Sequence, residues 1–410
     1  MWSLRALRGR KKPSIGLRGV SSFGFDYEVL YESRRSRARV GVIRTSNGLI
    51  ETPAFVPVAT TGALKCVDLA LASREVLEMG MVFVNTYHLM VHPGVDLVKR
   101  AGGLHAFIGY DGPLITDSGG YQVFSMASTG PQDELKGKSV SKWRNPCAGG
   151  ANRGLVLKID EEGVTFRSYR NGELLELTPE ISVKAQKSIG ANIILPLDIL
   201  LPNSADFETL IDCFHRTHRW ESRSLEEHLK DQGHQVMYAI IHGGTDVRLR
   251  EASLEYLSRR PFQGFAIGGS LGKNRLEMYD LLSHLCPKIP RSLPVHLLGI
   301  GDVPSILRGV ELGIDTFDSA YPTRAGRHGS WLTADGSFVN LKGQSFAERV
   351  QSPPVDLCDC PVCRCHSGAY VHHLYKAKEP VASQLGSIHN LYRMTRLMKE
   401  IRERILSGAM

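Results

Sequence analysis

Short apolar runs alternate with longer amphipathic segments along the chain from about residue 51. The apolar runs predict strands at 54–58, 81–86, 113–117, 192–198, 237–242, 264–268, 296–300 and 314–318. Apolar residues at helical spacing predict helices at about 66–79, 181–190, 206–230, 247–258, 274–285 and 303–312. Near-continuous apolar strands separated by helices are typical of a parallel sheet with covered faces. Eight such units predict an α/β fold of the (β/α)8 TIM barrel type, with a doubly wound open sheet as the alternative.

Two segments interrupt this alternation. Residues 123–178 follow the third predicted strand and contain Asn171-Gly172, a dipeptide typical of a hairpin turn. Residues 340–410 follow the eighth strand and contain a cluster of cysteines. We therefore expect three parts, namely a basic leader at 1–25, a barrel at 26–339 with its insertion at about 123–178, and a metal-binding subdomain with a C-terminal helix at 340–410.

Charge is distributed unevenly along the chain. The net charge is +8, of which +6 lies in residues 1–25 and +5 in residues 324–410, so the remainder carries −3. A basic C-terminal part beside a mildly acidic body suits a polyanion that is held from one side. The chain is 42% apolar and contains no uncharged apolar run of about 18 residues. We therefore expect a soluble protein without a membrane partner.

The leader, residues 1–25, is basic, contains serine and has no acidic residue. That composition is typical of an organellar transit peptide and predicts a mitochondrial or plastid location. The alternative is a disordered basic extension on a protein that remains cytoplasmic.

Three carboxylates directly follow or end predicted strands: Asp117, Asp198 and Asp318. The carboxyl ends of all barrel strands open at one mouth, where barrel active sites lie. We therefore expect the three carboxylates to lie together. Glycine-containing segments end three other strands at the same mouth, namely His242-Gly243-Gly244, Gly268-Gly269 and Gly299 to Asp302. Because glycine lets a ligand approach the backbone closely, this mouth is predicted to be a ligand pocket.

Two of these carboxylates have both a chemical and a structural interpretation. Asp117, in ITDSGGYQVFS, is either a general acid/base beside a stacking surface, Tyr121, or a residue that caps the next turn. Asp198 follows IILPL and is suited to accept hydrogen bonds from adjacent N–H groups on a purine-like ring. Helix capping by Asp198 is disfavoured, because seven residues, one of them Pro202, separate it from the next predicted helix.

Asp318 lies in GIDTFDSAYPTRAGRHG, ahead of Arg324 and Arg327. A carboxylate at a strand end beside two arginines is suited to chemistry on a nucleic acid, although an Asp after a strand is often only a turn residue. Among three carboxylates at one mouth, one could attack an anomeric carbon and another could act as acid/base. This division of roles is that of retaining sugar-transfer enzymes.

The cysteine cluster predicts a metal site. The pattern Cys358-x-Cys360-x2-Cys363-x-Cys365 is followed by His366, His372, His373 and His389. Thiolates at this spacing can reach one tetrahedral zinc, whose fourth ligand is either Cys365 or a histidine. The zinc is predicted to be structural, because the carboxylates lie elsewhere in the chain.

The segment HNLYRMTRLMKEIRERIL predicts an amphipathic helix with an apolar stripe formed by Leu391, Met394, Met398, Ile401 and Ile405. We expect this stripe to pack on the barrel, which leaves Arg393, Arg396 and Arg402 for solvent or phosphate. No phosphate-binding loop and no dinucleotide fingerprint occurs in the chain, so neither ATP nor NAD is implied.

Taken together, these segments resemble the tRNA-guanine transglycosylase family, also called queuine tRNA-ribosyltransferases. The resemblance runs from about Arg37 to Ile405 and rests on TPAFVPVAT, NTYHL, HPG, TDSGGYQVFS, FD-x3-PTR and C-x-C-x2-C…IHN. It implies a (β/α)8 barrel with a zinc subdomain, one structural Zn²⁺ per chain, and a role in queuosine formation. The implied reaction replaces guanine at the tRNA anticodon wobble position with a 7-deazaguanine base.

The resemblance also implies roles for individual residues. Asp318 would be the nucleophile that holds the tRNA covalently, and Asp117 the general acid/base. The implied base-binding residues are Asp198, Tyr121, Gln122, His242, Gly268, Gly269 and Leu298. Arg324 and Arg327 match tRNA-contacting arginines, while Cys358, Cys360, Cys363 and His389 match the zinc ligands.

Several positions depart from the family pattern. His242 stands where a glutamine is usual, and the loop GGSLGKN is shorter than usual, with Lys273 near an expected glutamate. These variants are similar to those of a chlamydial-type branch, and they leave open whether queuine or its aminomethyl precursor is inserted. The resemblance implies a homodimer, or a heterodimer with a non-catalytic paralogue. The alternative function is that of the non-catalytic tRNA-binding partner, which the presence of both Asp117 and Asp318 disfavours.

Overall fold

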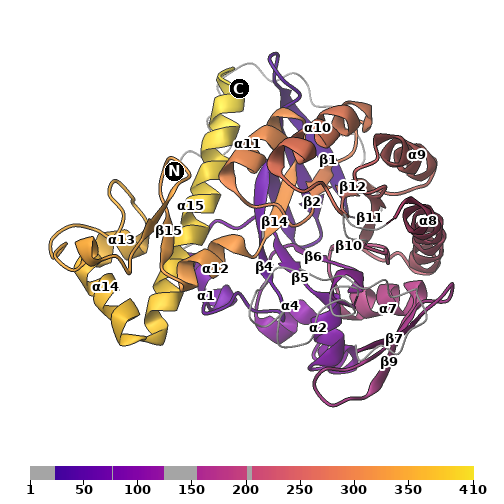
Figure 1. Ribbon diagram of the computed structural model, residues 1–410, viewed down its shortest axis with the longest axis horizontal. Coiled ribbons are helices and arrows are strands. Elements are labelled where there is room, and N and C mark those ends of the chain that lie inside the picture. Colours follow the sequence, from indigo (N-terminus) through magenta and orange to yellow (C-terminus); the bar gives the residue numbers. More distant parts are fainter. Residues whose placement is uncertain (1–23, 76, 124–154, 201–205) are drawn as a thin grey trace.

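The computed structural model describes residues 24–75, 77–123, 155–200 and 206–410 (Figure 1). Eight parallel strands form a closed barrel in the order β10-β11-β12-β13-β14-β4-β5-β6. Their bounds are β4 Ala54–Ala59, β5 Val82–Val84, β6 Leu114–Thr116, β10 Ile193–Ile194, β11 Val236–Ile241, β12 Gly264–Ile267, β13 Val295–Leu297 and β14 Thr316–Ser319. Each of them overlaps one of the eight predicted strands, so the predicted TIM barrel is confirmed and the open sheet is excluded.

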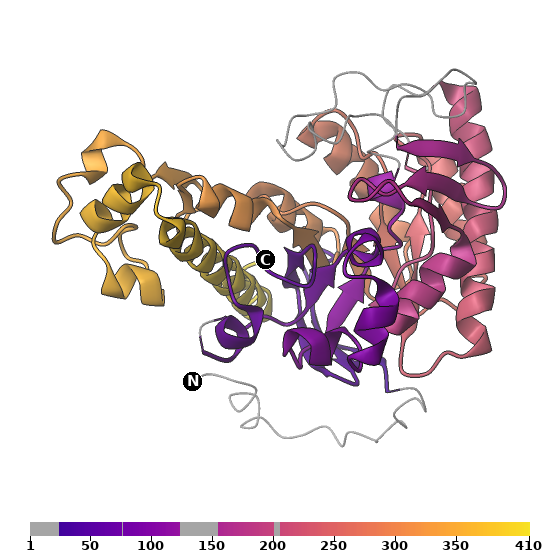
Figure 2. The ribbon, with the colours of Figure 1, turned by 90° about the horizontal axis from the view of Figure 1, so that it is seen from below.

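Helices cover the outside of the barrel (Figures 1 and 2). They are α1 Leu69–Glu75, α2 Thr86–Val91, α3 Val95–Arg100, α4 Leu104–Ile108, α7 Pro179–Ile189, α8 Phe207–Lys230, α9 Val247–Ser258, α10 Arg275–Leu285, α11 Val303–Glu311 and the short 3-10 helix η2 Cys286–Lys288. All six predicted helices are present. None of the helices in the described part of the chain is long and apolar enough to cross a membrane.

A small antiparallel sheet that the apolar pattern did not predict adjoins the barrel. It consists of β1 Asp26–Glu32, β2 Arg39–Thr45 and β3 Gly48–Thr52. Ile43 and Ile50 of this sheet are fully buried in the same cluster as inward-facing barrel residues such as Val56 and Ile115. The sheet therefore contributes to the apolar core inside the barrel.

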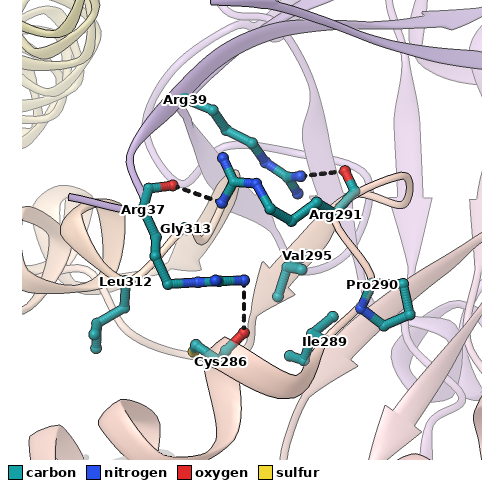
Figure 3. Close-up of a pocket in the computed structure, with 9 residues that line it drawn as sticks. All are labelled: Arg37, Arg39, Cys286, Ile289, Pro290, Arg291, Val295, Leu312 and Gly313. Atoms are coloured by element: carbon teal, nitrogen blue, oxygen red, sulfur yellow. Dashed lines mark hydrogen bonds between the residues drawn. The ribbon is translucent and has the colours of Figure 1, made fainter. Parts of the chain in front are cut away.

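A buried ion pair joins this sheet to the barrel strands. It lies at the end of the barrel opposite Asp117, Asp198 and Asp318. The guanidinium of Arg39 donates to both carboxylate oxygens of Asp315, at 2.9 and 2.6 Å. Asp315 also accepts from the Val295 N–H at 2.7 Å. Figure 3 shows Arg39 beside Arg37 and Arg291, around a small pocket. A buried pair with its hydrogen bonds satisfied is costly to break, because the partner left behind is an unpaired charge.

The insertion after the third strand is described in part. It contains the antiparallel strands β7 Val156–Ile159, β8 Val164–Arg167 and β9 Leu174–Leu177. The predicted turn at Asn171-Gly172 lies between β8 and β9, and Gly172 has φ +75°. The predicted hairpin is therefore confirmed, while residues 124–154 of the insertion lie outside the described part of the chain.

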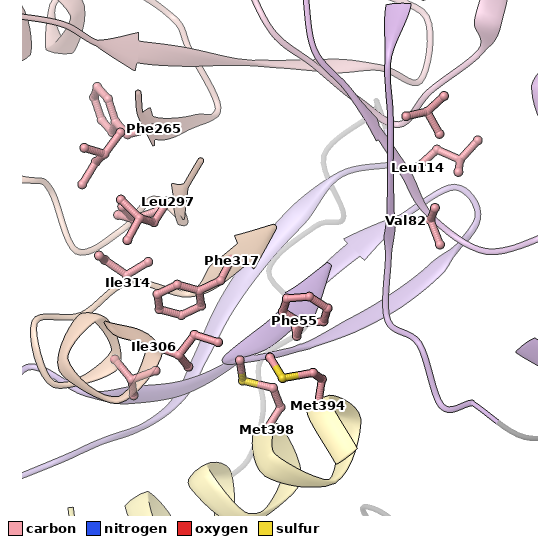
Figure 4. Packing of buried hydrophobic residues seen from close by; sticks show 14 of the residues in the cluster. Phe55, Val82, Leu114, Phe265, Leu297, Ile306, Ile314, Phe317, Met394 and Met398 are labelled. Carbon is pink, nitrogen blue, oxygen red and sulfur yellow. The ribbon is translucent and has the colours of Figure 1, made fainter. Parts of the chain in front are cut away.

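The C-terminal part leaves the barrel and returns to it. After β14 come α12 Tyr321–Arg327, β15 Ser330–Leu332, β16 Phe338–Asn340, the 3-10 helix η3 Gln344–Phe346, α13 Pro361–Cys365, α14 Gly368–Ala377 and α15 Pro380–Leu406. Helices α13 and α14 stand away from the barrel, whereas the far half of α15 lies along it (Figures 1 and 2). Met394 and Met398 of α15 face Phe55 and Phe317 of the barrel strands (Figure 4).

Packing of α15 confirms the predicted apolar stripe, all five residues of which are buried in the barrel cluster. Two of the arginines on this helix do not have the predicted freedom. Arg402 donates to the Pro53 carbonyl at 2.8 Å and pairs with Glu51 at 3.2 Å, and Arg393 is buried. The prediction that these two arginines are available for phosphate is wrong, because α15 packs against the barrel through more of its circumference than the stripe.

Candidate active site and metal centre

Asp318 lies on β14 at the carboxyl end of the barrel. The strand alternates, so that Phe317 packs outward beneath the helices while Thr316 and Asp318 point inward. The carboxylate is buried and accepts two hydrogen bonds on the same oxygen, Oδ1. One comes from the Gly299 N–H at 2.8 Å and one from His296 Nε2 at 3.1 Å. The carboxylate is thus held in one orientation.

Asp117 directly follows β6 and is held by the start of α2. Its Oδ1 accepts from the Thr86 N–H at 2.8 Å and the Gly119 N–H at 3.2 Å, and its Oδ2 accepts from the Asn85 side-chain amide. Burial, with smaller contributions from the charges of Asp198 and Asp318, raises the pKa of Asp117 to about 7. At neutral pH this carboxyl group can therefore both give and take a proton.

Asp198 lies beside Asp117 at the same mouth. Its Oδ1 accepts from the Ser118 hydroxyl at 3.2 Å, and burial raises its pKa to about 6. The Nε2 atom of His242 lies 3.5 Å from Asp198 Oδ2 and has no hydrogen-bond partner among the described residues. Burial lowers the pKa of His242 well below its usual value, so the imidazole is neutral. A carboxylate and a neutral imidazole thus stand together with unused hydrogen-bonding capacity.

The loop after β12 is shaped by glycines and held by one buried arginine. A side chain at Gly268 would come within 2.8 Å of Ile240 and 3.0 Å of Leu298, and Gly269 has φ +75°. Arg250 of α9 donates to the carbonyls of Gly268 at 2.7 Å and Ser270 at 2.9 Å. The same guanidinium donates to Gly244 at 2.9 Å and to Ile241, so it joins the loops after two neighbouring strands.

Tyr121 and Gln122 follow the Ser118-Gly119-Gly120 turn. A side chain at Gly120 would lie 2.8 Å from the Asp198 carbonyl oxygen, so the turn packs directly against that strand end. The side chain of Tyr121 is 54% exposed. Gln122 is half-buried, and its Oε1 atom is buried without a hydrogen-bond partner among the described residues.

Arg324 and Arg327 belong to α12, directly after Asp318. Arg324 is exposed and Arg327 is half-buried, and neither forms an ion pair within the described parts of the chain. Helix α12 lies close against α15, since a side chain at Gly326 would come within 2.3 Å of the Gly386 carbonyl oxygen. That packing, with a hydrogen bond from the Tyr375 hydroxyl to the Gly326 carbonyl at 2.5 Å, fixes the helix that carries both arginines.

Three sulfurs and one imidazole nitrogen converge beyond α12. The potential ligand atoms of Cys358, Cys360, Cys363 and His389 lie within 4.8 Å of one another. The three sulfur atoms, in chain order, lie 3.8, 3.4 and 3.3 Å from His389 Nδ1. Cys365 is exposed and does not belong to the cluster. The fold thus selects the histidine over Cys365, an alternative that spacing alone left open. Three cysteines and one histidine are a donor set typical of structural zinc.

The ring of His389 is oriented by contacts on the side that faces away from the sulfurs. His389 Nε2 donates to the Leu332 carbonyl at 2.8 Å, and the ring stacks on Trp331 with centroids 4.6 Å apart. Because Nε2 carries the hydrogen, Nδ1 presents its lone pair to the sulfurs, as in metal-bound histidines. The cluster could hold a metal ion and is compatible with zinc.

The structure brings the three predicted carboxylates to one mouth, with His242 and Gly268-Gly269 beside them. Asp302, from the segment predicted after the seventh strand, caps α11 and pairs with Arg275 at 3.1 Å. Residues that sequence reasoning missed support the site from within: His296, Arg250, Asn85, Thr86 and Ser118. Of these, only His296 is a polar residue inside an apolar strand, whereas Arg250 lies in a helix with other charged residues and Asn85, Thr86 and Ser118 lie at or just after strand ends.

Comparison with known proteins places the chain among close relatives. A family model described as "Queuine tRNA-ribosyltransferase" matches residues 34–410. A protein of that name from Protochlamydia amoebophila is 50% identical over 381 residues, which are 93% of this chain and 95% of that protein. Proteins of the same name from Chlamydia caviae and Chlamydia trachomatis are 46% identical over 382 residues, covering 93% of this chain and 98% of theirs.

These relatives are bacterial, and that finding contradicts the predicted mitochondrial or plastid location. The prediction rested on the composition of residues 1–25 alone. A basic stretch that contains serine and lacks acidic residues does not distinguish a targeting signal from other basic extensions.

Proposed function

The chain belongs to the queuine tRNA-ribosyltransferase family and is a tRNA-guanine transglycosylase, and from this premise we propose how its mouth carries out the exchange. The resemblance inferred from the motifs, including the chlamydial-type variants, is thereby confirmed. We propose that the enzyme replaces guanine at the anticodon wobble position with a 7-deazaguanine base, through an ester between Asp318 and the ribose. The observation that carries the proposal is the convergence of three differently held carboxyl groups at one barrel mouth.

In the first step, a carboxylate oxygen of Asp318 attacks C1′ of the ribose. The bond between C1′ and guanine N9 breaks, and its electron pair leaves with the base. The protonated form of Asp117 supplies a proton to the departing guanine, which leaves neutral. A pKa of about 7 makes this form available at neutral pH.

In the second step, Asp117 is a carboxylate and removes the N9 proton of the incoming base. The base nitrogen attacks C1′, the bond from C1′ to Asp318 breaks, and the carboxylate returns with the electron pair. Two displacements retain the configuration at C1′. One glycosidic bond replaces another, so the exchange needs neither ATP nor NAD.

Base recognition is assigned to the side of the mouth that lies across the barrel from Asp318. Asp198 accepts from adjacent N–H groups of the base, and the neutral His242 presents Nε2 beside it. Tyr121 stacks on the base, and the neighbouring Gln122 has a buried oxygen without a hydrogen-bond partner in the described part of the chain. Gly268, Gly269 and Leu298 form the wall held by Arg250. Which 7-deazaguanine enters depends on His242 and the short loop after Gly269.

Contacts with tRNA are assigned to α12 and the C-terminal part. Arg324 and Arg327 would bind phosphate near the ribose that Asp318 attacks. Zinc held by Cys358, Cys360, Cys363 and His389 would cross-link the cysteine segment at 358–363 to α15. It would take no part in the exchange. We propose that residues 340–410 act with the barrel at 26–339 on one tRNA, in a homodimer or with a non-catalytic paralogue.

Guanine exchange provides the test. Purified protein is given unmodified tRNA and labelled guanine, with Asp318→Asn as the variant and Asp280→Asn, an exposed position on α10, as the matched control. The proposal expects incorporation by the wild type and the control, and none by Asp318→Asn with zinc content unchanged. Undiminished exchange by Asp318→Asn overturns the nucleophile assignment. Tight tRNA binding without exchange by the wild type would favour the non-catalytic partner. Supplying the aminomethyl precursor and queuine separately then identifies the incoming base.

A further inference from the structure

The two oxygens of the Asp318 carboxylate are in different environments. Oδ1 accepts from both the Gly299 N–H and His296 Nε2, at 2.8 and 3.1 Å. Among the described residues, none hydrogen-bonds to Oδ2. An oxygen with two donors is the poorer nucleophile, so Oδ2 is the atom left for attack on C1′.

His296 is built into the barrel interior. It is fully buried on β13, its ring stacks on Phe83 with centroids 6.1 Å apart, and its Nδ1 lies 2.8 Å from the Thr316 hydroxyl. Because a carboxylate can only accept, Nε2 carries a hydrogen and donates to Asp318. The Thr316 hydroxyl then occupies the other ring nitrogen, and Phe83 fixes the plane of the ring. This imidazole therefore has a fixed position behind the nucleophile.

We propose that His296, together with the Gly299 N–H, stabilises the Asp318 carboxylate as the leaving group of the second displacement. The inference rests on the proposed role of Asp318 as nucleophile. When Oδ2 is bonded to C1′, Oδ1 is the carbonyl oxygen of a neutral ester. When that bond breaks, negative charge returns to the carboxylate and spreads onto Oδ1, where both donors already point. Fixed donors aimed at developing charge lower the barrier of the step that creates it.

This arrangement has a directional consequence. Hydrogen bonds to a carboxylate are stronger than those to a neutral carbonyl, so the two donors favour the free carboxylate over the ester. Removing the His296 donor should therefore raise the proportion of enzyme held as the covalent tRNA adduct and slow its discharge by the incoming base. A residue with only a packing role would, when replaced, reduce adduct formation together with every other activity.

Adduct discharge is the experiment. Enzyme is incubated with end-labelled tRNA, quenched in detergent at intervals after addition of excess guanine, and the protein-bound label is separated on a denaturing gel. His296→Leu removes both ring nitrogens, whereas His296→Gln keeps an amide donor within reach of Asp318. Thr316→Val frees the far ring nitrogen without removing the imidazole. Zinc content and melting temperature are measured for each variant.

Loss of one hydrogen bond to a charged group predicts that His296→Leu discharges the adduct roughly 10- to 100-fold more slowly than the wild type. More adduct should accumulate before guanine is added, the KM for tRNA should fall because discharge then limits turnover, and His296→Gln should recover most of the rate. Discharge by folded His296→Leu at the wild-type rate overturns the inference, as does equal loss in both His296 variants. If His296→Leu does not fold, Thr316→Val must show slower discharge, and a wild-type rate there overturns the inference. Absence of any Asp318-dependent adduct in the wild type would instead refute the proposed function.

Discussion

Replacement of Asp198 by asparagine should stabilise the protein while it abolishes base exchange. The side chain is only 14% exposed and its Oδ1 accepts one hydrogen bond, from Ser118. Burial raises its pKa from 3.8 to about 6. The folded state therefore binds the proton more tightly than the unfolded state does. The associated stability is fully present below pH 3.8 and is lost as the pH rises through about 6.

The size of the effect follows from the pKa. A rise of this size corresponds to about 3 kcal/mol of folding free energy at pH 8. Residual contact with water reduces this to about 2 kcal/mol, because the remaining exposed edge of the carboxylate stays partly hydrated. In a chain of this length that is a rise in melting temperature of roughly 2 to 3 °C. At pH 5 the gain should be about half as large, because the folded wild type is then mostly protonated.

Thermal unfolding at pH 8 and pH 5 measures the gain, with Asp280→Asn as a matched control for the same chemical change at an exposed position. Guanine incorporation is measured on the same samples. A variant that melts below the wild type at pH 8, or that gains equally at both pH values, refutes the reasoning about burial. A stabilised variant that still exchanges guanine at the wild-type rate refutes the assignment of Asp198 to base recognition.

Three further predictions concern the supports of the site. The exchange rate should show an ionisation near pH 7 that Asp117→Asn removes along with most of the activity, as a pH–rate profile would reveal. Arg250→Met should raise the KM for the base about tenfold and cost roughly 2 to 4 kcal/mol of stability, because several loop carbonyls lose a charged donor. The control is Arg248→Met, at an exposed position on the same helix, which should change neither the KM nor the stability. Cys363→Ala should abolish binding of about one zinc per chain and lower the melting temperature, whereas Cys365→Ala, outside the cluster, should leave metal analysis unchanged.

The barrel was predictable because its strands are buried on both faces. Such strands appear as short apolar runs, and all eight were found within a few residues of their ends. The sheet of β1 to β3 was not predicted, because its strands mix charged and apolar residues and β1 is at least partly exposed at every position. Its register is set by pairing between strands, which a hydrophobic pattern read one strand at a time does not reveal.

The acidic residues of the site were predictable for a geometric reason, since the carboxyl ends of barrel strands must meet. His296 was not, because in the three-residue strand Val295–Leu297 the pattern does not show which side chain faces inward. Arg250 lies in the predicted helix at 247–258, and only the fold shows that its side chain turns toward two loops. The choice of His389 over Cys365 likewise depended on the return of α15 to the cysteines, a contact between distant parts of the chain.

Mapping the covalent attachment to tRNA tests the central claim most directly. Enzyme incubated with tRNA is denatured and digested with protease and nuclease, and the peptide that retains a nucleotide is sequenced by mass spectrometry. The account predicts a ribosyl ester on Asp318, absent from Asp318→Asn and discharged by added guanine. An ester on Asp117, or continued base exchange with no attachment to the protein, would contradict it.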